Sequence, residues 1–295
     1  MPGQLKEVRS RIKSVSSTQQ ITKAMKVVSA AKLRKAQDRI IQMRPYSNKL
    51  NEMLSNIAGG SEGAGSVSFA REREVKNVLM IVVTSDRGLC GGFNSNILKL
   101  AVKTMNENYG SHVQAGKLTI LPIGKKALEF FRRRNIPVIA DYSTLFLDLN
   151  FEATSKAAQF VMDGFENKTF DKVDIVYSQF KNAATQIFNI EAFLPVAKPS
   201  ASKTQTKKLD LIFEPSKDEM MIHLVPKILK TQLFKVLLDS NASEHGARMT
   251  AMDKASDNAN EILRELKIKY NRARQAAITT ELTEIVSGAA ALNAE

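Results

Sequence analysis

The chain has 295 residues, of which 43 % are hydrophobic, so it can build a substantial core in one or two domains. No apolar run approaches the roughly 18 residues that a membrane-spanning helix needs. A single cysteine, Cys90, excludes an internal disulfide, and three scattered histidines make a metal site unexpected. The net charge is +13, and residues 1–58 hold 12 Lys and Arg against 3 Asp and Glu, which predicts an acidic partner for this segment.

One long helix is predicted over residues 1–58. Glycine is absent between Gly3 and Gly59, and Pro45 marks a possible bend. At about 1.5 Å per residue the helix would be roughly 80 Å long. Alternating steps of three and four residues trace a heptad seam with apolar ends and a polar middle. The seam consists of Leu5, Val8, Ile12, Val15, Gln19, Thr22, Lys26, Ser29, Leu33, Ala36, Ile40, Met43, Ser47, Leu50, Leu54 and Ile57.

The polar middle of this seam has apolar neighbours on another face of the helix, at Ile21, Met25 and Val28. A long amphipathic helix needs a partner to cover its apolar face. We therefore expect the ends of the helix to face a second helix and the middle to face something else.

Residues 59–75 are predicted to be a linker, because GGSEGAGSVS at 59–68 is rich in glycine and serine. Strand and helix patterns then alternate over 76–215, which indicates an α/β, Rossmann-like domain with a largely parallel sheet. The segment 199–208 is predicted to be an exposed loop. The expected strands are 77–83, 117–124, 136–140, 173–180, 185–195 and 210–215, and the expected helices are 93–108, 125–134 and 151–166.

A second long helix is predicted from Pro226 to about Leu292, within a C-terminal segment 216–295 whose start is a short helical lead-in. Two long terminal helices around an α/β domain predict an antiparallel coiled coil, with the C-terminal tip projecting beyond the N-terminal helix. Its seam consists first of Ala242, His245, Met249, Met252, Ser256, Ala259, Leu263, Leu266, Tyr270, Ala273 and Ala277. The spacing then shifts by one residue, and the seam continues with Ile278, Leu282, Ile285, Ala289 and Leu292.

The turn TSDRGLCGGFN, residues 84–94, joins a buried strand to a helix, as phosphate-binding loops do. It lacks the Gly-Lys-Ser/Thr ending of a Walker A motif and the spacing G-x-G-x-x-G. We expect its glycines to supply positive φ angles and close packing, Ser85 and Asp86 to cap the following turn, and Arg87 to be exposed. The turn residues of interest are Asp86, Arg87, Gly88, Gly91 and Gly92.

Two alternative functions remain open at this point. A nucleotide-dependent α/β enzyme is suggested by the turn, although Cys90 has no nearby histidine that could activate it as a nucleophile. A basic coiled-coil protein that binds nucleic acid is suggested by MKVVSAAKLRKAQ, residues 25–37, which carries three cations within one helical turn, although aromatic residues for base stacking are scarce there. In SEHGARMTAMDKASDNA, residues 243–259, ordinary coiled-coil packing around Arg248 also remains open.

Four motifs in order, ITKAMKVVSAAKLRKAQ, TSDRGLCGGFN, SEHGARMTAMDKASDNA and ITTELTEIVSGAAAL, make the chain resemble the γ subunits of F-type ATP synthases over nearly its full length. The resemblance implies a rotor shaft inside a ring of three α and three β subunits, with the globular domain outside it near the ε subunit and the c-ring. The δ subunit belongs to the same complex. The β subunits hold the catalytic sites, so no catalytic residue, cofactor, metal or nucleic acid is expected for this chain.

The resemblance also implies which residues touch the ring. Met25 and the cations after it would face a lever loop of β, four polar residues would form a catch with the ring, and the tip from Ile285 to Leu292 would sit in an apolar bearing. The full set is Met25, Lys26, Lys32, Arg34, Lys35, Arg248, Gln275, Thr279, Glu281, Ile285 and Leu292.

The resemblance and the N-terminus bear on regulation and location. Chloroplast γ subunits carry a regulatory cysteine pair, so thiol switching of that kind is not expected in a chain with Cys90 alone. The N-terminus MPGQLKEV shows no targeting pattern. We expect a peripheral protein on the cytoplasmic face of a bacterial plasma membrane, or alternatively on the matrix side of the mitochondrial inner membrane.

Overall fold

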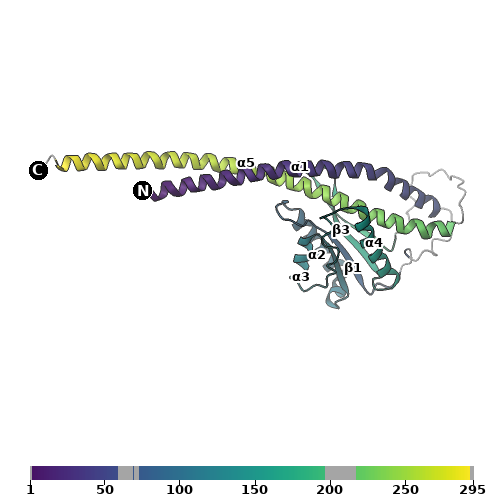
Figure 1. The fold of residues 1–295 in the computed structure, drawn as a ribbon. Helices are drawn as coiled ribbons and strands as arrows, with labels where there is room; N and C mark the ends of the chain where they lie inside the picture. Colours follow the sequence, from purple (N-terminus) through teal and green to yellow (C-terminus); the bar gives the residue numbers. More distant parts are fainter. Residues whose placement is uncertain (1, 59–68, 70–72, 197–216, 293–295) are drawn as a thin grey trace. The chain divides into compact units, whose positions relative to one another are not determined.

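The computed structural model describes residues 2–58, 69, 73–196 and 217–292, drawn as a ribbon in Figure 1. The chain divides into two compact units. The coiled-coil unit comprises Met1–Ser29 and Met249–Glu295, and the globular unit comprises Ala30–Arg248. Two long helices, α1 (Pro2–Ala58) and α5 (Lys217–Leu292), contribute to both units. This architecture confirms the predicted fold class of long terminal helices with a central α/β domain.

The globular unit is built on a sheet whose strand order is β2-β1-β3-β4. The strands are β1 (Val78–Val83), β2 (Leu118–Ile123), β3 (Lys172–Phe180) and β4 (Gln186–Leu194). β1 pairs in parallel with β2 and β3, whereas β4 runs antiparallel to β3. The largely parallel sheet that the alternating pattern predicts is therefore confirmed.

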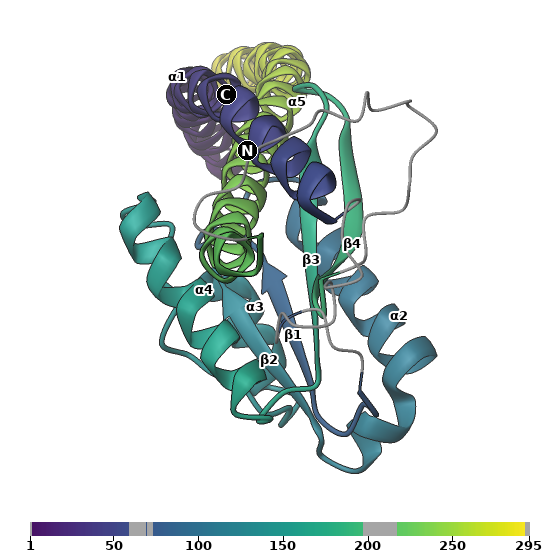
Figure 2. The same ribbon diagram turned by 90° about the vertical axis from the view of Figure 1, so that its right-hand side faces the viewer.

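Helices cover both faces of this sheet. Helices α2 (Phe93–Gln114) and α3 (Lys125–Arg132) pack on the face to which Val78, Met80 and Val82 of β1 point. Helix α4 (Phe151–Glu166) and the N-terminal part of α5 pack on the other face, and Figure 2 shows α4 and α2 on opposite sides of the sheet. Because side chains alternate along a strand, a strand covered on both faces must be apolar throughout. All six residues of β1 are buried accordingly.

The structure corrects two predicted elements. The expected strand 136–140 is reduced to a single bridge between Ile120 and Val138, because Pro137 has no N–H to donate to a longer ladder. Helix α5 begins at Lys217 and continues through Pro226, where the prediction placed its start. Val225 and Leu229 on either side of this proline are buried, and tertiary packing holds the helix together across the missing N–H. Residues 59–68 of the predicted linker 59–75, the predicted loop 199–208 and the predicted strand 210–215 lie outside the described residues.

The predicted seams of the two long helices are buried or half-buried along most of their described length, and the seam of α5 becomes exposed from Ile278 onward. In α1 the fully buried seam positions include Leu33, Ala36 and Ile40, all in the globular unit. In α5 they include Met252, Leu263 and Leu266 of the coiled-coil unit. The spacing of apolar residues therefore predicted correctly which stripe of each helix faces inward.

Candidate functional site

The turn after β1 holds the start of helix α3 through the chain's own oxygen atoms. The backbone N–H of Lys125 donates to Asp86 Oδ1 at 3.1 Å, and that of Ala127 donates to Thr84 Oγ1 at 2.9 Å. The N–H of Lys126 donates to the Ser85 carbonyl at 3.2 Å. These are the donors with which a helix N-terminus would bind phosphate. At α3 these donors are satisfied within the chain. Asp86 was expected to cap the turn directly after it in the sequence, but it caps the start of α3 instead.

The expected conformations of the glycines are only partly correct. Gly91 has a positive φ of 59°, but Gly88 and Gly92 do not, and the second left-handed residue of the turn is Leu89, with φ 64°. The glycine that allows a close approach is Gly124, where an added Cβ would lie 2.1 Å from the Thr84 carbonyl oxygen. The signal in the sequence was its place at the end of the predicted strand 117–124, directly after the observed β2.

Cys90 is a buried packing residue of this turn. Its side chain is almost completely inaccessible, and its Sγ accepts a hydrogen bond from Asn94 Nδ2 at 3.2 Å. A thiol needs both access and a base to act as a nucleophile, and this site provides neither among the described contacts. The part of the chain that the structure describes also contains no cluster of three or more metal-ligating side chains.

The coiled-coil unit joins α1 to α5 through a ladder of polar pairs. Thr22 Oγ1 and Ser256 Oγ lie 2.8 Å apart and are buried, and Lys26 Nζ lies 2.5 Å from Asp253 Oδ1. Further along, Gln19 donates to Asn260, and Arg9 donates to the Tyr270 hydroxyl at 3.1 Å. The polar middle of the α1 seam therefore still faces α5. The expectation that it turns toward something else is wrong, because polar side chains of α5 lie opposite it.

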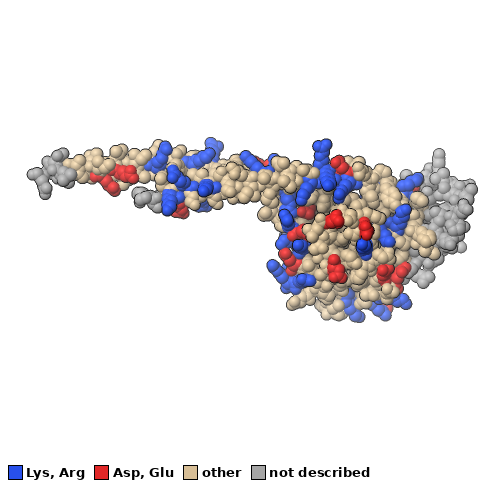
Figure 3. Space-filling model, viewed as in Figure 1, with Lys and Arg blue, Asp and Glu red and all other residues tan. Residues whose placement is uncertain are grey.

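The apolar flank of α1 beside this ladder is exposed. Ile21 is 57 % exposed and Val28 is 55 % exposed, while Met25 between them is half-buried. Lys32, Arg34 and Lys35 continue α1 into the globular unit and are exposed as well. Figure 3 shows Lys and Arg side chains distributed along both units on the face that it presents. An apolar flank followed by cations is the type of surface that contacts a partner.

The C-terminal tip of α5 presents a second apolar surface. The seam residues Ile278, Leu282 and Ile285 are 49 %, 58 % and 67 % exposed, and Figure 1 shows α5 extending past the N-terminal end of α1. Gln275, Thr279 and Glu281 are exposed on the same segment, and Leu292 ends the helix with a side chain outside the described part. The predicted projection of the tip is confirmed, and its large apolar side chains have no cover within the described residues.

A family model described as ATP synthase matches residues 4–292. The ATP synthase gamma chain of Cytophaga hutchinsonii is 53 % identical over 295 residues, covering 99 % of this chain and all of that protein. The chain belongs to this family. The gamma chain of Flavobacterium psychrophilum is 52 % identical over 289 residues, with 98 % of each chain covered.

Solved structures of low sequence identity share the fold. A chain of the Euglena gracilis mitochondrial ATP synthase, from a structure of OSCP, F1 and c-ring, matches with a TM-score of 0.68 at 20 % identity, covering all of this chain and 96 % of that one. A chain from the central stalk and c-ring of the Tetrahymena thermophila enzyme matches with a TM-score of 0.57 at 23 % identity, covering 80 % and 99 %. No helix in the described part of this family member is both long and apolar enough to span a bilayer.

Among the residues that the family resemblance implicates in ring contacts, Arg248 is unusual because it is buried. It is 8 % exposed, and its Nη2 lies 2.5 Å from Glu244 Oε1. The guanidinium also donates to the backbone carbonyls of Arg87 and Gly88. A ring contact through Arg248 stays a prediction, and in the chain itself the side chain joins α5 to the turn after β1.

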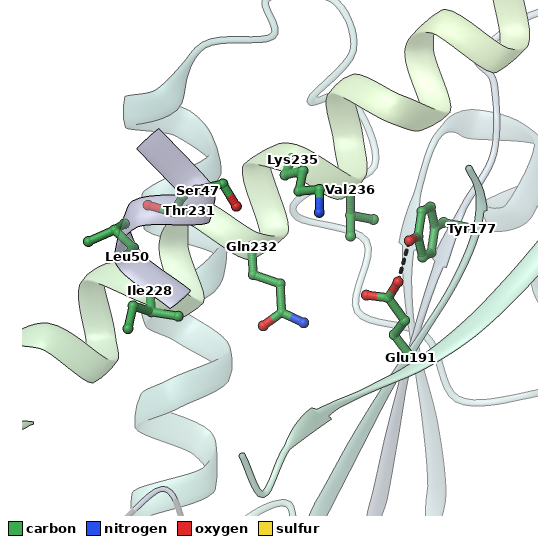
Figure 4. A pocket seen from close by; sticks show the side chains of 9 residues that line it. All are labelled: Ser47, Leu50, Tyr177, Glu191, Ile228, Thr231, Gln232, Lys235 and Val236. Atoms are coloured by element: carbon green, nitrogen blue, oxygen red, sulfur yellow. Dashed lines mark hydrogen bonds between the residues drawn. The ribbon is translucent and has the colours of Figure 1, made fainter. Parts of the chain in front are cut away.

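The globular unit contains a polar cavity of about 240 Å³ that the sequence did not reveal. Figure 4 shows its lining from α1, the β3–β4 pair and α5, with Tyr177 donating a hydrogen bond to Glu191. Thr231 Oγ1 is buried at this cavity without a hydrogen-bond partner. The lining residues are Ser47, Leu50, Tyr177, Glu191, Ile228, Thr231, Gln232, Lys235 and Val236.

Asp239, one helical turn after Lys235, is a buried carboxyl group that follows the apolar residues Val236, Leu237 and Leu238 of α5. Burial raises its pKa to about 6, against the opposing attraction of Lys235 and Arg44. Because the pKa is raised on folding, the folded chain binds more protons than the unfolded chain between about pH 4 and pH 6. The contribution of Asp239 to stability is therefore most favourable at low pH and is lost as the pH rises through this window.

Asp239→Asn is accordingly expected to stabilise the globular unit by about 2 kcal/mol at pH 8, because a neutral amide avoids the cost of a buried charge. Urea denaturation from pH 3.5 to pH 8 measures the effect, and the advantage of the variant should vanish below about pH 4. The exposed Asp141→Asn is the control. A variant that is equally stable or less stable than the wild type at pH 8 would contradict the assignment of a buried charge.

Proposed function

We propose that this chain is the central rotor shaft of an ATP synthase, turning inside a ring of three α and three β subunits. The observation that carries the proposal is full-length membership of the gamma chain family. The exposed apolar tip of α5 supports it, since a surface of this kind needs a partner. Proton flow would turn the c-ring and the shaft together, and the asymmetric shaft would impose different conformations on the three β subunits.

The shaft surface suits a sliding contact. The tip offers Ile278, Leu282 and Ile285, whose apolar contacts are non-directional and are easily exchanged during rotation. Lys32, Arg34 and Lys35 of α1 are exposed and therefore screened, so they would attract acidic loops without forming a rigid bond. By contrast, the polar ladder between Thr22 and Ser256 is buried and keeps the two helices of the shaft together.

The chain itself would be non-catalytic, with nucleotide held by other subunits. It would be peripheral to the membrane through the complex, on the cytoplasmic face of a bacterial plasma membrane, with ε, δ and the c-ring as further partners. We propose that the exposed members of the implicated set contact the ring: Lys32, Arg34, Lys35, Gln275, Thr279, Glu281 and Ile285.

Co-purification tests this function. Expressed with the α and β subunits of the same organism, the tagged chain is expected to recover them in a 1:3:3 complex that hydrolyses ATP. The tagged chain expressed without α and β is the control. A chain that purifies stably alone and never enters such a complex would remove the proposal.

The nucleic-acid alternative has no support from the family comparison, and a separate measurement addresses it. A protein that neutralises several phosphates binds with an affinity that falls steeply with salt. We expect the purified complex to show no salt-sensitive binding to duplex DNA or to RNA. Tight binding that weakens with salt would return the alternative to consideration.

A further inference from the structure

Two motifs that are far apart in the sequence meet inside the globular unit at Arg248. Its Nη1 donates to the carbonyl of Gly88, and its Nη2 donates to the carbonyl of Arg87 at 3.3 Å. The same Nη2 lies 2.5 Å from Glu244 Oε1, one helical turn earlier in α5. The guanidinium thus binds two consecutive carbonyls of the turn after β1 and one carboxylate of its own helix.

The backbone of the turn is shaped to present these carbonyls. Leu89 follows Gly88 directly and has φ 64°, a left-handed conformation that leucine rarely adopts. The Leu89 side chain is 67 % exposed, so burial of that side chain does not account for the unfavourable backbone. Strained backbone persists where surrounding contacts hold it in place. The contacts made by Arg248 contribute to this, together with Ser85 Oγ, which donates to the Arg87 carbonyl at 2.7 Å.

Within the globular unit, helix α5 comes close to β3 and the β3–β4 turn just before Arg248. Ser243 Oγ donates to the Ser178 carbonyl at 3.2 Å, and an added Cβ at Gly246 would lie 3.2 Å from the Ala183 carbonyl oxygen. Arg248 is the last residue of α5 that belongs to the globular unit, and Met249 begins the coiled-coil unit. Arg248 therefore makes its contacts at the C-terminal end of the α5 segment that belongs to the globular unit.

We propose that Arg248 is a positioning residue that anchors α5 to the turn after β1, so that the globular unit and the shaft helix rotate together without slipping. The inference rests on the rotor function proposed above. It also gives TSDRGLCGGFN a role, because its Arg87 and Gly88 carbonyls are the anchor points. The planar guanidinium fork reaches both carbonyls and Glu244 at once, which the single ammonium of a lysine does not.

The test uses the complete ATP synthase in membrane vesicles and measures protons pumped per ATP hydrolysed. Arg248→Met is combined with Glu244→Gln, so that no buried carboxylate is left unpaired. This ratio is expected to fall by at least about twofold, a typical range for residues that couple distant sites. Arg248→Lys, with Glu244 kept, should lower it less. An unchanged ratio in an assembled double variant would overturn the proposal.

A covalent replacement for the anchor gives the matched rescue. Ala183→Cys with Gly246→Cys, in a Cys90→Ser background, places one cysteine on each side of the close approach, where an added Cβ at 246 lies 3.3 Å from the Ala183 Cα. Added to the anchor-deficient variant, the oxidised pair should restore the pumping ratio and the reduced pair should not. Loss of assembly alone would lower ATP hydrolysis and proton pumping together and leave their ratio unchanged. If the disulfide forms and the ratio is not restored, the result would count against a mechanical anchor.

Amide hydrogen exchange separates this inference from the rotor proposal. In the full chain, the amides of residues 87–91 are expected to exchange faster in the double variant than in the wild type, whether or not the chain enters a ring. A wild-type chain that never assembles would remove the rotor proposal and leave this measurement to decide the anchor. Equal exchange in both chains would overturn the anchor and leave the rotor proposal intact.

Discussion

Gly124→Ala is expected to lower the free energy of unfolding of the globular unit by about 4 kcal/mol. Gly124 has φ 105°, which an alanine rarely adopts, and its added Cβ would lie 2.1 Å from the Thr84 carbonyl oxygen. That neighbour is backbone and cannot rotate away, and the Thr84 side chain already accepts the N–H of Ala127 at the start of α3. The substitution therefore strains the turn and displaces a helix cap at the same time.

Gly110→Ala is the control for this prediction, because Gly110 lies in a helix and an added Cβ there meets no atom within 4 Å. It is expected to leave the stability unchanged or to raise it by about 0.5 kcal/mol. Urea denaturation of the full-length variants, with proteolysis as the probe of unfolding of the globular unit, measures both effects through the transition midpoints. Equal midpoints for Gly124→Ala and the wild type would show that the turn between β2 and α3 relaxes freely.

Ile285→Asp is expected to weaken binding of the shaft to the α and β ring at least about tenfold, because a carboxylate would enter an apolar bearing without a partner. The side chain is 67 % exposed in the chain, so the substitution should change the free energy of unfolding by less than about 0.5 kcal/mol. Competition between tagged wild-type and variant chains for limiting ring subunits measures the effect.

Leu147→Asp is the matched control, since Leu147 is 71 % exposed in the globular unit, which would lie outside the ring. It should compete as well as the wild type. Equal competition by Ile285→Asp would show that the exposed tip does not enter the bearing, and the contact proposed for it would have to be abandoned.

The elements with regular periodicity were the most predictable. The heptad spacing in α1 and α5 identified the buried stripes, and the apolar run 78–83 identified the central strand. Prediction failed where packing outweighed local preference, as at Pro226, which α5 passes without ending. It also failed in the polar middle of the α1 seam. Polar residues are unfavourable in an apolar coiled-coil seam, but here polar residues of α5 lie opposite them and form hydrogen bonds and an ion pair with them.

Sequence motifs identified the residues implicated in ring contacts, but they did not predict the burial and the contacts of these side chains within the chain. Exposure at Lys32, Arg34 and Ile285 agrees with a contact role, which stays a prediction. Burial of Arg248 could not be foreseen, because small neighbours along one helix do not show which loop approaches it. The raised pKa of Asp239 was equally hidden, since a carboxyl in an apolar stretch can point to solvent or to the core.

By itself the sequence determined the two long helices, the alternation of strands and helices between them, and the family to which the chain belongs. These properties depend on local spacing and on motif order, which are written along the chain. Only the tertiary structure decided that Asp86 and Thr84 cap α3, that a side chain at Gly124 would collide with the Thr84 carbonyl, and that Arg248 binds carbonyls 160 and 161 residues away. The physical reason is that each of these roles depends on which groups packing brings within hydrogen-bonding or contact distance.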